Sequence, residues 1–284
     1  MYYTLILISA LFTLIPRKIA LSIGRGLGLL IYRLKPVRKE IAQKNLTVCF
    51  PHLNNDEREK IIKKCYKHFG MVLIDFLRLR GLNKKNIHKI LTLDNNSRKI
   101  LEAQNGAIIM SGHIGNWEMC TPGFGLNDFL LGIVTQTQRN KSGDRFFNWI
   151  RYNKKVRLIP KKESKDVMKK VLEDNGFLGL AIDQNAGDRG VEVPFFSSTT
   201  SMPVGAGYFH IKTKKPILIG YCMLDDNLKY KLTILEIDKN IINDTQNDLI
   251  YNVNQHFSKV LEELIKKTPE QYFWFHRKLD KKNY

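Results

Sequence analysis

A histidine and a glutamate lie five residues apart where a predicted buried strand ends. The apolar run 107–110 is followed by His113 and Glu118 in the stretch "IIMSGHIGNWEM". Each residue of an α-helix turns the chain by about 100°, so the two side chains would point apart if the whole segment were helical. They can meet only if His113 lies on a turn before the helix, and Gly112 and Gly115 give that turn the backbone freedom it needs. We therefore predict a general base, His113, oriented by the Glu118 carboxylate.

The surroundings of His113 contain no nucleophile of a familiar kind. Ser111 precedes it but lacks the G-x-S-x-G elbow that exposes a catalytic serine. The proton would then come from a substrate hydroxyl or amine, which indicates direct acyl transfer without a covalent enzyme intermediate. The N-terminus of the following helix would offer free N–H groups to a developing negative charge. The alternative is a buried histidine that only accepts hydrogen bonds at a helix start.

The elements that must position these residues follow from hydrophobic periodicity. Strands are predicted at 107–110, 130–135, 156–160 and 177–182, with a strand pair at 217–223 and 230–237. Helices are predicted at about 55–80, capped by Asn55 or Asp56, from Gly115 onward, and at 142–152, 164–174 and 246–267. This alternation predicts an α/β fold, with a mainly parallel central sheet flanked by helices. Ligands bind beyond the carboxyl ends of such strands, where His113, Asp183 and Gln184 are expected.

Composition limits the partners. The 284-residue chain carries 46 Lys and Arg against 27 Asp and Glu, a formal net charge of +19. Such a charge favours polyanions, namely nucleic acid, an anionic membrane surface or an acidic protein. The four cysteines have no metal-ligand spacing, which predicts reduced thiols and no metal or cofactor. A non-catalytic basic module is the rival class, but no nucleic-acid motif is present and the lysines do not gather into one patch.

The N-terminus raises a membrane question. Residues 2–15 carry no charge, yet a full span needs about 20 apolar residues. A second segment repeats apolar residues at helical spacing, and its Gly24 and Gly28 allow close helix contact. We expect residues 1–35 to be an N-terminal membrane anchor, part inserted and part lying in the interface, and residues 36–284 to be the catalytic domain. The alternative is that both segments are buried core helices.

Five segments carry a resemblance that spans almost the whole chain. They are "LIPRKIALSIGRGLGLLIYRL", "KNLTVCFPHLNNDEREKIIKKCYKHFG", "GAIIMSGHIGNWEM", "LAIDQNAGDRGVEVPFFSSTTSMPVGAG" and "TPEQYFWFHRKLD". Together they resemble the bacterial lipid A biosynthesis late acyltransferases, within the wider H-x4-D/E lysophospholipid acyltransferase group. The chain departs from this pattern at Leu279, where the family usually carries tryptophan.

The resemblance implies a function. Such enzymes take a fatty acyl chain from an acyl carrier protein thioester and add it to a hydroxyl of a membrane glycolipid, typically the Kdo-bearing lipid A precursor. They need no cofactor and act at the bacterial inner membrane, with the catalytic domain on the cytoplasmic face. His113 would deprotonate the acceptor hydroxyl, and Glu118 would orient and polarise the imidazole.

The same resemblance suggests the remaining site residues. Arg151 matches the family's functional arginine best, for an oxyanion or phosphate contact, and Arg145 is its rival. Asn116 would shape the turn and donate to substrate, Asp183 and Gln184 would hold the acceptor sugar or organise the loop, and Arg189 would suit an anionic headgroup. The apolar segments 121–125 and 193–196 are candidates for an acyl groove or for core packing.

Three alternatives stay open on sequence alone. The same base would serve another acceptor, such as a phosphatidylinositol mannoside, an aminolipid or a lysophospholipid. A thioesterase would instead release free fatty acid without an acceptor. The binding-only module is disfavoured by the intact pair of His113 and Glu118.

Overall fold

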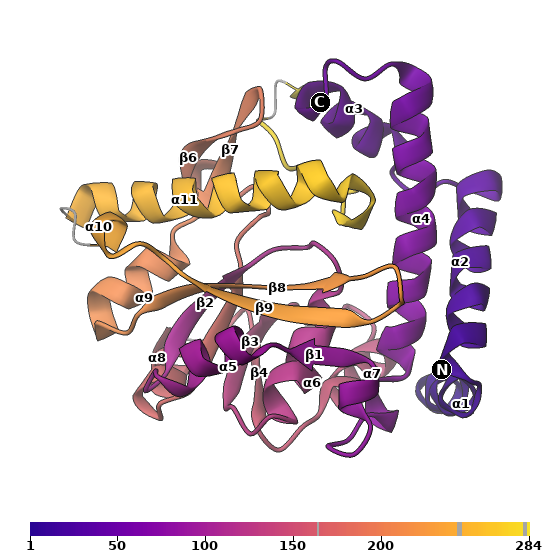
Figure 1. Cartoon of the computed structure of the whole chain (residues 1–284), viewed down its shortest axis with the longest axis horizontal. Helices are drawn as coiled ribbons and strands as arrows, with labels where there is room; N and C mark the ends of the chain where they lie inside the picture. Colours follow the sequence, from indigo (N-terminus) through magenta and orange to yellow (C-terminus); the bar gives the residue numbers. More distant parts are fainter. Residues whose placement is uncertain (164, 243–245, 281–282) are drawn as a thin grey trace.

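A seven-stranded sheet forms the centre of the molecule. The computed structural model describes residues 1–163, 165–242, 246–280 and 283–284. Within them the strand order is β1-β9-β8-β2-β5-β3-β4, and β6 and β7 form a separate antiparallel hairpin (Figure 1). The strands are β1 Leu91–Leu93, β2 Ala107–Ser111, β3 Leu131–Thr135, β4 Val156–Pro160, β5 Phe177–Ala181, β6 Gly190–Phe195, β7 Ser198–Pro203, β8 Ile217–Leu224 and β9 Tyr230–Glu236.

The predicted mainly parallel sheet is confirmed. Strand β2 pairs in parallel with both β5 and β8, and β3 pairs in parallel with β4 and β5. The strand pair predicted near the C-terminus is the antiparallel β8–β9 ladder, and β1 joins its outer edge in parallel with β9. The carboxyl ends of β2, β5, β3 and β8 therefore meet at one edge of the sheet, because parallel neighbours share their direction.

Side chains alternate between the two faces of the sheet. In β2, Ile108 and Met110 belong to one buried cluster, and Ala107 and Ile109 belong to the other, as the period of two residues requires. The first cluster is covered by α8 Lys165–Glu173, α9 Gly205–Thr213 and α11 Gln246–Lys267. The second is covered by α5 Asn95–Glu102, α6 Cys120–Gly125 and α7 Lys141–Arg151. Helices on both faces were predicted, and they are present.

Helix α4, Asn55–Leu77, stands at one edge of the sheet and contributes to both clusters (Figure 1). Its cap is Asn54, one residue before the predicted position, because Asn54 and Glu57 form a reciprocal capping box. A 3-10 turn, Leu79–Gly81, replaces the predicted last α-helical turn. A short helix, α3 Lys39–Cys49, leads into α4.

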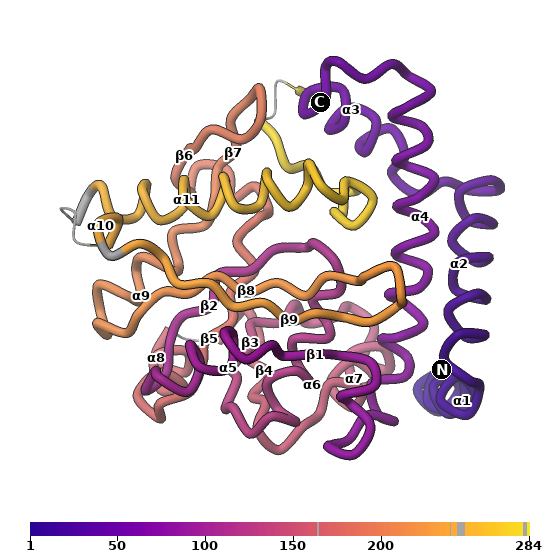
Figure 2. Tube along the Cα trace, in the orientation of Figure 1, coloured from indigo at the N-terminus to yellow at the C-terminus, as the bar shows by residue number. Residues whose placement is uncertain are grey.

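The N-terminal segment forms two helices, α1 Tyr2–Leu14 and α2 Arg17–Leu34, and α2 runs along the outside of α4 (Figure 2). The predicted close contact at the glycines is confirmed. A Cβ on Gly28 would lie 2.0 Å from the Tyr66 carbonyl oxygen, and one on Gly24 would lie 2.6 Å from that of Gly70. In the described part of the chain, neither these helices nor any other combines the length and the apolar character that crossing a bilayer demands. The division at residue 35 stays a prediction.

Many of the apolar side chains of α1 and α2 are exposed. Tyr3 and Leu14 are 75% and 82% exposed. The exposed apolar face, the name used below for these side chains, comprises Tyr3, Leu7, Leu11, Leu14, Ile19, Ile23, Leu27, Leu30, Ile31 and Leu34. The helical spacing predicted in α2 is thus present, but most of the predicted stripe points away from the core.

Three predictions about elements were wrong or incomplete. No α-helix begins at Gly115, because its φ of +62° is in the left-handed region and not in that of a right-handed helix. A 3-10 turn, η3 Trp117–Met119, precedes α6 instead. The loop expected after β5 contains a 3-10 turn, η4 Gly187–Arg189, and the β6–β7 hairpin. Helix α9 was not predicted, and a four-residue helix, α10 Lys239–Ile242, precedes α11.

Candidate active site

His113 and Asp183 meet at the carboxyl edge of the sheet. Each lies two residues beyond a strand, and these strands, β2 and β5, are parallel neighbours with Ser111 opposite Ala181. The Asp183 carboxylate accepts two hydrogen bonds from His113, one from the backbone N–H at 2.9 Å and one from Nδ1 at 2.7 Å. The approach needs a small residue between them, because a Cβ on Gly112 would lie 3.1 Å from the Asp183 carboxyl carbon.

The environment of this pair shifts the pKa values of both groups. Burial works to lower the pKa of His113, but the charge and the hydrogen bond of Asp183, helped by the charge of Glu118, raise that pKa above its ordinary value. For Asp183, burial works to raise the pKa, and the neighbouring His113 and Lys278 together hold it far below its usual range. With Nδ1 bound to Asp183, the other ring nitrogen, Nε2, is the one available to a substrate.

The carboxylate on the imidazole is therefore Asp183 and not Glu118, as the spacing had suggested. Arg151 donates from Nε and Nη2 to the two Glu118 oxygens at 2.7 and 2.6 Å, a bidentate ion pair. Glu118 follows Asn116 in the η3 turn, and its carboxylate is directed at the end of α7. His113 does lie before the helical turn as predicted, and the Glu118 charge still acts on its pKa.

Backbone contacts hold the turn between His113 and Glu118 in place. Gly115 donates its N–H to the Gln271 carbonyl, and its own carbonyl contacts the ring of the buried His68 at 3.1 Å. A Cβ on Gly115 would lie 2.0 Å from the Cys222 carbonyl oxygen in β8, so only glycine fits. Burial lowers the pKa of His68 to about 4, with the Gly115 contact opposing, so this ring stays neutral at pH 7.

A cavity of about 250 Å³ opens beside the histidine, under the carboxyl ends of the strands. His113, Glu118 and Arg151 are the histidine, the acidic residue and the arginine in its wall, and polar side chains such as Gln136 and Gln138 lie beside them. The remaining wall is mostly apolar and includes Ile109, Phe124, Leu131, Ile133, Val134, Leu180 and Leu232. Gly179 and Gly220 also line it, and each leaves room where a larger residue of the sheet would project. Of the two segments predicted for an acyl groove, 121–125 contributes Thr121 and Phe124, whereas 193–196 places Val193 and Phe195 in the core.

The other predicted site residues fall into two groups. Asn116 is fully buried behind the turn, and Gln184 places its Nε2 3.4 Å from Nε2 of His113. Arg151 lies in the cavity, whereas its rival Arg145 stacks over the ring of Tyr2 at 4.2 Å. Arg189 is exposed on η4 and is not among the described residues that line the cavity. The fold thus brings together all of the predicted residues except Arg189.

Sequence reasoning missed the part that the C-terminus plays. His276 stacks on His113 with ring centroids 5.3 Å apart, and burial followed by the charge of His113 lowers its pKa to about 4. Lys278 is buried, its Nζ lies 4.7 Å from the centre of the Phe195 ring, and among the described residues it has no hydrogen-bond partner. Burial lowers the pKa of Lys278 to about 8 against the pull of Asp183. The signal was the box "FWFHRK", where three ionisable residues directly follow three aromatic ones.

An imidazole held by a buried aspartate, in the wall of a mostly apolar cavity, defines an α/β protein with a candidate general-base site. Among the described residues, no group of three or more His, Cys, Asp or Glu side chains is arranged to hold a metal ion. Comparison with known families narrows the class. The chain belongs to the bacterial lipid A biosynthesis acyltransferase family, whose model matches residues 1–281, so the resemblance drawn from the five motifs is confirmed.

Curated relatives agree with this assignment. The chain is 23% identical over 271 residues to a lipid A biosynthesis lauroyltransferase of Escherichia coli, covering 93% of this chain and 86% of the relative. It is 23% identical over 274 residues to the lipid A biosynthesis palmitoleoyltransferase of the same organism, with the same coverage. A lipid A biosynthesis acyltransferase of Haemophilus influenzae is 23% identical over 275 residues, covering 93% and 85%. An acyltransferase is what the family and these relatives support.

Proposed function

We propose that the protein transfers a fatty acyl chain from an acyl carrier protein thioester to a hydroxyl of a membrane glycolipid, the Kdo-bearing lipid A precursor. The observation that carries the proposal is the placement of His113: its Nδ1 is bound to Asp183, and it lines a cavity with apolar walls. Family membership and the names of the relatives support the acyl group and the lipid A acceptor.

His113 acts as the general base in this proposal. Its Nε2 takes the proton of the acceptor hydroxyl as the oxygen attacks the thioester carbonyl carbon. The tetrahedral oxyanion then collapses, the C–S bond breaks, and the leaving thiolate takes the proton from the imidazolium. Asp183 stabilises that imidazolium and fixes which ring nitrogen carries the proton at rest.

Arg151 would supply positive charge to the oxyanion. Its guanidinium lies in the cavity wall, and the rings of Phe76 and Phe147 lie 5.3 and 5.0 Å from its central carbon. The two-point contact with Glu118 fixes the plane of the guanidinium, so little reorganisation is needed when charge develops. In this proposal Glu118 orients Arg151, in addition to acting on His113 through its charge.

The partners proposed for the site have complementary chemistry. The net charge of +19 would steer an acidic carrier protein to the surface. The exposed apolar face of α1 and α2 would lie in the bilayer interface, because exposed leucine and isoleucine side chains next to the exposed Lys18 suit a layer of lipid tails and phosphates. We infer a location at the bacterial inner membrane, with the catalytic domain on the cytoplasmic face.

The test is an assay of the purified full-length chain with acyl carrier protein thioester and the Kdo-bearing lipid A precursor, read by mass spectrometry of the lipid. We expect the acceptor to gain one acyl chain, and we expect His113→Ala to reduce the rate at least about 10³-fold, since general-base catalysis and its geometry are lost together. The exposed His88→Ala serves as the matched control. If His113→Ala transfers the acyl chain at the wild-type rate, the mechanism is refuted. Release of free fatty acid without acceptor would identify a thioesterase.

A further inference from the structure

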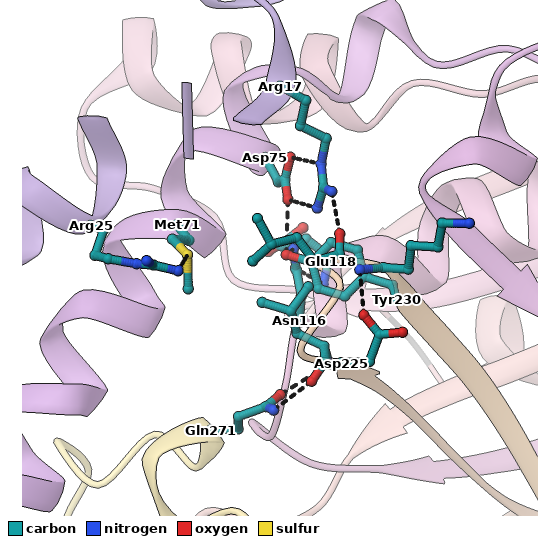
Figure 3. A network of polar contacts seen from close by, with 12 residues as sticks. Arg17, Arg25, Met71, Asp75, Asn116, Glu118, Asp225, Tyr230 and Gln271 are labelled. Carbon is teal, nitrogen blue, oxygen red and sulfur yellow. Dashed lines mark hydrogen bonds and ion pairs between the residues drawn. The ribbon is translucent and has the colours of Figure 1, made fainter. Parts of the chain in front are cut away.

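A continuous chain of buried polar groups connects the N-terminal helices with the candidate active site (Figure 3). Arg17, the first residue of α2, donates from Nε and Nη2 to the two oxygens of Asp75 in α4, at 2.9 and 2.6 Å. The hydroxyl of Tyr230 in β9 donates to the same carboxylate at 2.9 Å. Asn116 donates from Nδ2 to that hydroxyl at 3.0 Å, and its Oδ1 accepts the backbone N–H of Glu118 at 3.2 Å.

The direction of each hydrogen bond follows from the one before it. A hydroxyl has a single proton, and Tyr230 gives it to Asp75, so its oxygen can only accept from Asn116. The Asn116 amide must therefore point its NH₂ group at Tyr230 and its oxygen at the N–H of Glu118. Both neighbours therefore require the same orientation of the Asn116 amide, because the Glu118 N–H can only donate and the Tyr230 oxygen can only accept.

Burial makes this arrangement hard to replace. Asp75, Tyr230 and Asn116 are 4%, 1% and 0% exposed, so water has little access to their polar atoms. Burial, followed by the charge of Asp75, raises the pKa of Tyr230 well above its ordinary value, so its hydroxyl keeps its proton. Removing one member would leave a neighbour buried and unsatisfied.

Arg17 supplies the positive charge that is paired with the buried Asp75 carboxylate. It also donates to the Leu228 carbonyl, which precedes β9, so it holds the strand that carries Tyr230. Without the guanidinium, Asp75 would be a buried charge without its ion-pair partner, and the carboxylate and the start of β9 would no longer be held in place. The Tyr230 hydroxyl, and with it the hydrogen bond from Asn116, would lose that support.

We propose that Arg17, Asp75 and Tyr230 are positioning residues for acyl transfer. They act through Asn116 on the turn that carries Glu118, and Glu118 in turn fixes Arg151 in the cavity. The inference rests on the proposed function and extends it: the N-terminal helical pair is part of the catalytic apparatus as well as a contact with the membrane.

The sharpest variant is Tyr230→Phe in the full-length chain, which removes one oxygen and keeps the ring. A displaced catalytic group costs up to about 10²-fold per ångström, so we expect kcat to fall about tenfold with KM for both substrates nearly unchanged. The matched control is Tyr32→Phe, which removes a tyrosine hydroxyl bonded to Glu59 in the same α2–α4 contact but away from the turn. Arg17→Lys, which keeps the charge and loses the two-point contact, should give a smaller fall in kcat.

A double-variant cycle decides whether the effect travels through Asn116. In an Asn116→Ala background, Tyr230→Phe should have no further effect on kcat, because the connection is already broken. Equal fractional losses in both backgrounds would overturn the inference. Binding to anionic vesicles should match wild type for Tyr230→Phe, and weakened binding that accounts for the loss in rate would also overturn it.

The outcomes separate the two proposals. A wild-type chain without transfer activity contradicts the proposed function itself. Wild-type activity that His113→Ala abolishes, together with equal kcat values for Tyr230→Phe and Tyr32→Phe, leaves the proposed function standing and refutes the positioning role.

Discussion

Replacing Asp183 by asparagine tests whether Asp183, and not Glu118, is the carboxylate that supports His113, because the two side chains have nearly the same shape. Asp183 is 2% exposed and accepts both from the backbone N–H and from Nδ1 of His113. The backbone N–H can only donate, so the asparagine oxygen must stay there and its NH₂ group must face Nδ1. Nδ1 then becomes the acceptor, and the ring proton moves to Nε2.

That shift of the proton leaves Nε2 of His113 unable to act as the base. With a proton on Nε2, the imidazole cannot accept the proton of the acceptor hydroxyl, and no carboxylate stabilises an imidazolium. We expect Asp183→Asn to reduce kcat by about 10³- to 10⁴-fold, equivalent to about 4–5.5 kcal/mol of activation free energy. The loss of charge-assisted hydrogen bonds should lower the free energy of unfolding by only about 1–3 kcal/mol.

The pH dependence of activity and of stability is a second test of the pairing of His113 with Asp183. The base must be neutral, so kcat/KM of the wild type should rise with pH through the raised pKa of His113. Without the carboxylate that raises this pKa, residual activity of Asp183→Asn should rise at a lower pH.

The stabilising effect of the ion pair is present above the ordinary aspartate pKa of about 3.9 and is lost as pH falls through the lowered pKa of Asp183. Because the imidazole must be protonated as well, the stabilisation by the ion pair is complete below about pH 6.5 and is lost as pH rises through the raised pKa of His113. The wild type should therefore exceed the variant in stability most clearly between about pH 4 and 6.5.

The assay is acyl transfer followed from about pH 5 to 9, with urea unfolding of both proteins alongside. Asp174→Asn is the matched control, since Asp174 forms surface ion pairs with Arg157 and Lys170 and lies outside the cavity wall. A loss of less than tenfold, or a pH profile displaced upward, would contradict the assignment of Asp183 as the partner of His113.

Three further predictions test the turn, the cavity and the membrane contact. Gly115→Ala should lower the free energy of unfolding by at least about 2 kcal/mol and reduce transfer, because a Cβ there meets a carbonyl oxygen of β8 at 2.0 Å at a φ of +62°; Gly26→Ala, with open space around it, should be neutral or stabilising in urea unfolding. Arg151→Gln should reduce kcat about 10²- to 10³-fold by loss of oxyanion stabilisation, whereas Arg145→Gln should stay within a few-fold; similar rates for the two variants would exclude this role. Leu14→Glu, at an 82% exposed position, should weaken flotation with anionic vesicles without lowering the melting temperature, and unchanged flotation would argue against a membrane contact at α1.

The mainly parallel sheet could be predicted because its signals are local. Each apolar run of four to six residues in the predicted strands falls on a strand of the structure, and the helical periods at 55–80, 142–152 and 246–267 fall on α4, α7 and α11. The β6–β7 hairpin escaped prediction because a serine- and threonine-rich run at 197–201, with Pro194 and Pro203 on either side, is typical of a loop. Its pattern resembles a loop until the partner strand is known.

The N-terminal helices show the same limit. Helical spacing and the need for small residues at Gly24 and Gly28 were evident from the sequence, and both are present in the α2–α4 contact. Spacing alone did not reveal which stripe is buried. The two glycines contact α4 and are buried together with Ala20 and Leu21, whereas Ile23, Leu27 and Leu30 are exposed, because close approach of two backbones favours small side chains at the points of contact.

The sequence by itself determined that a histidine follows a buried strand at the carboxyl edge of the sheet, since strand, glycines and histidine are neighbours in the chain. Only the tertiary structure decided its partner. Asp183 lies 70 residues from His113 and reaches it because β2 pairs with β5, while Glu118, five residues away, turns to Arg151. Strand order brings distant residues within hydrogen-bonding distance, and it depends on the packing of the whole sheet, which no local spacing records.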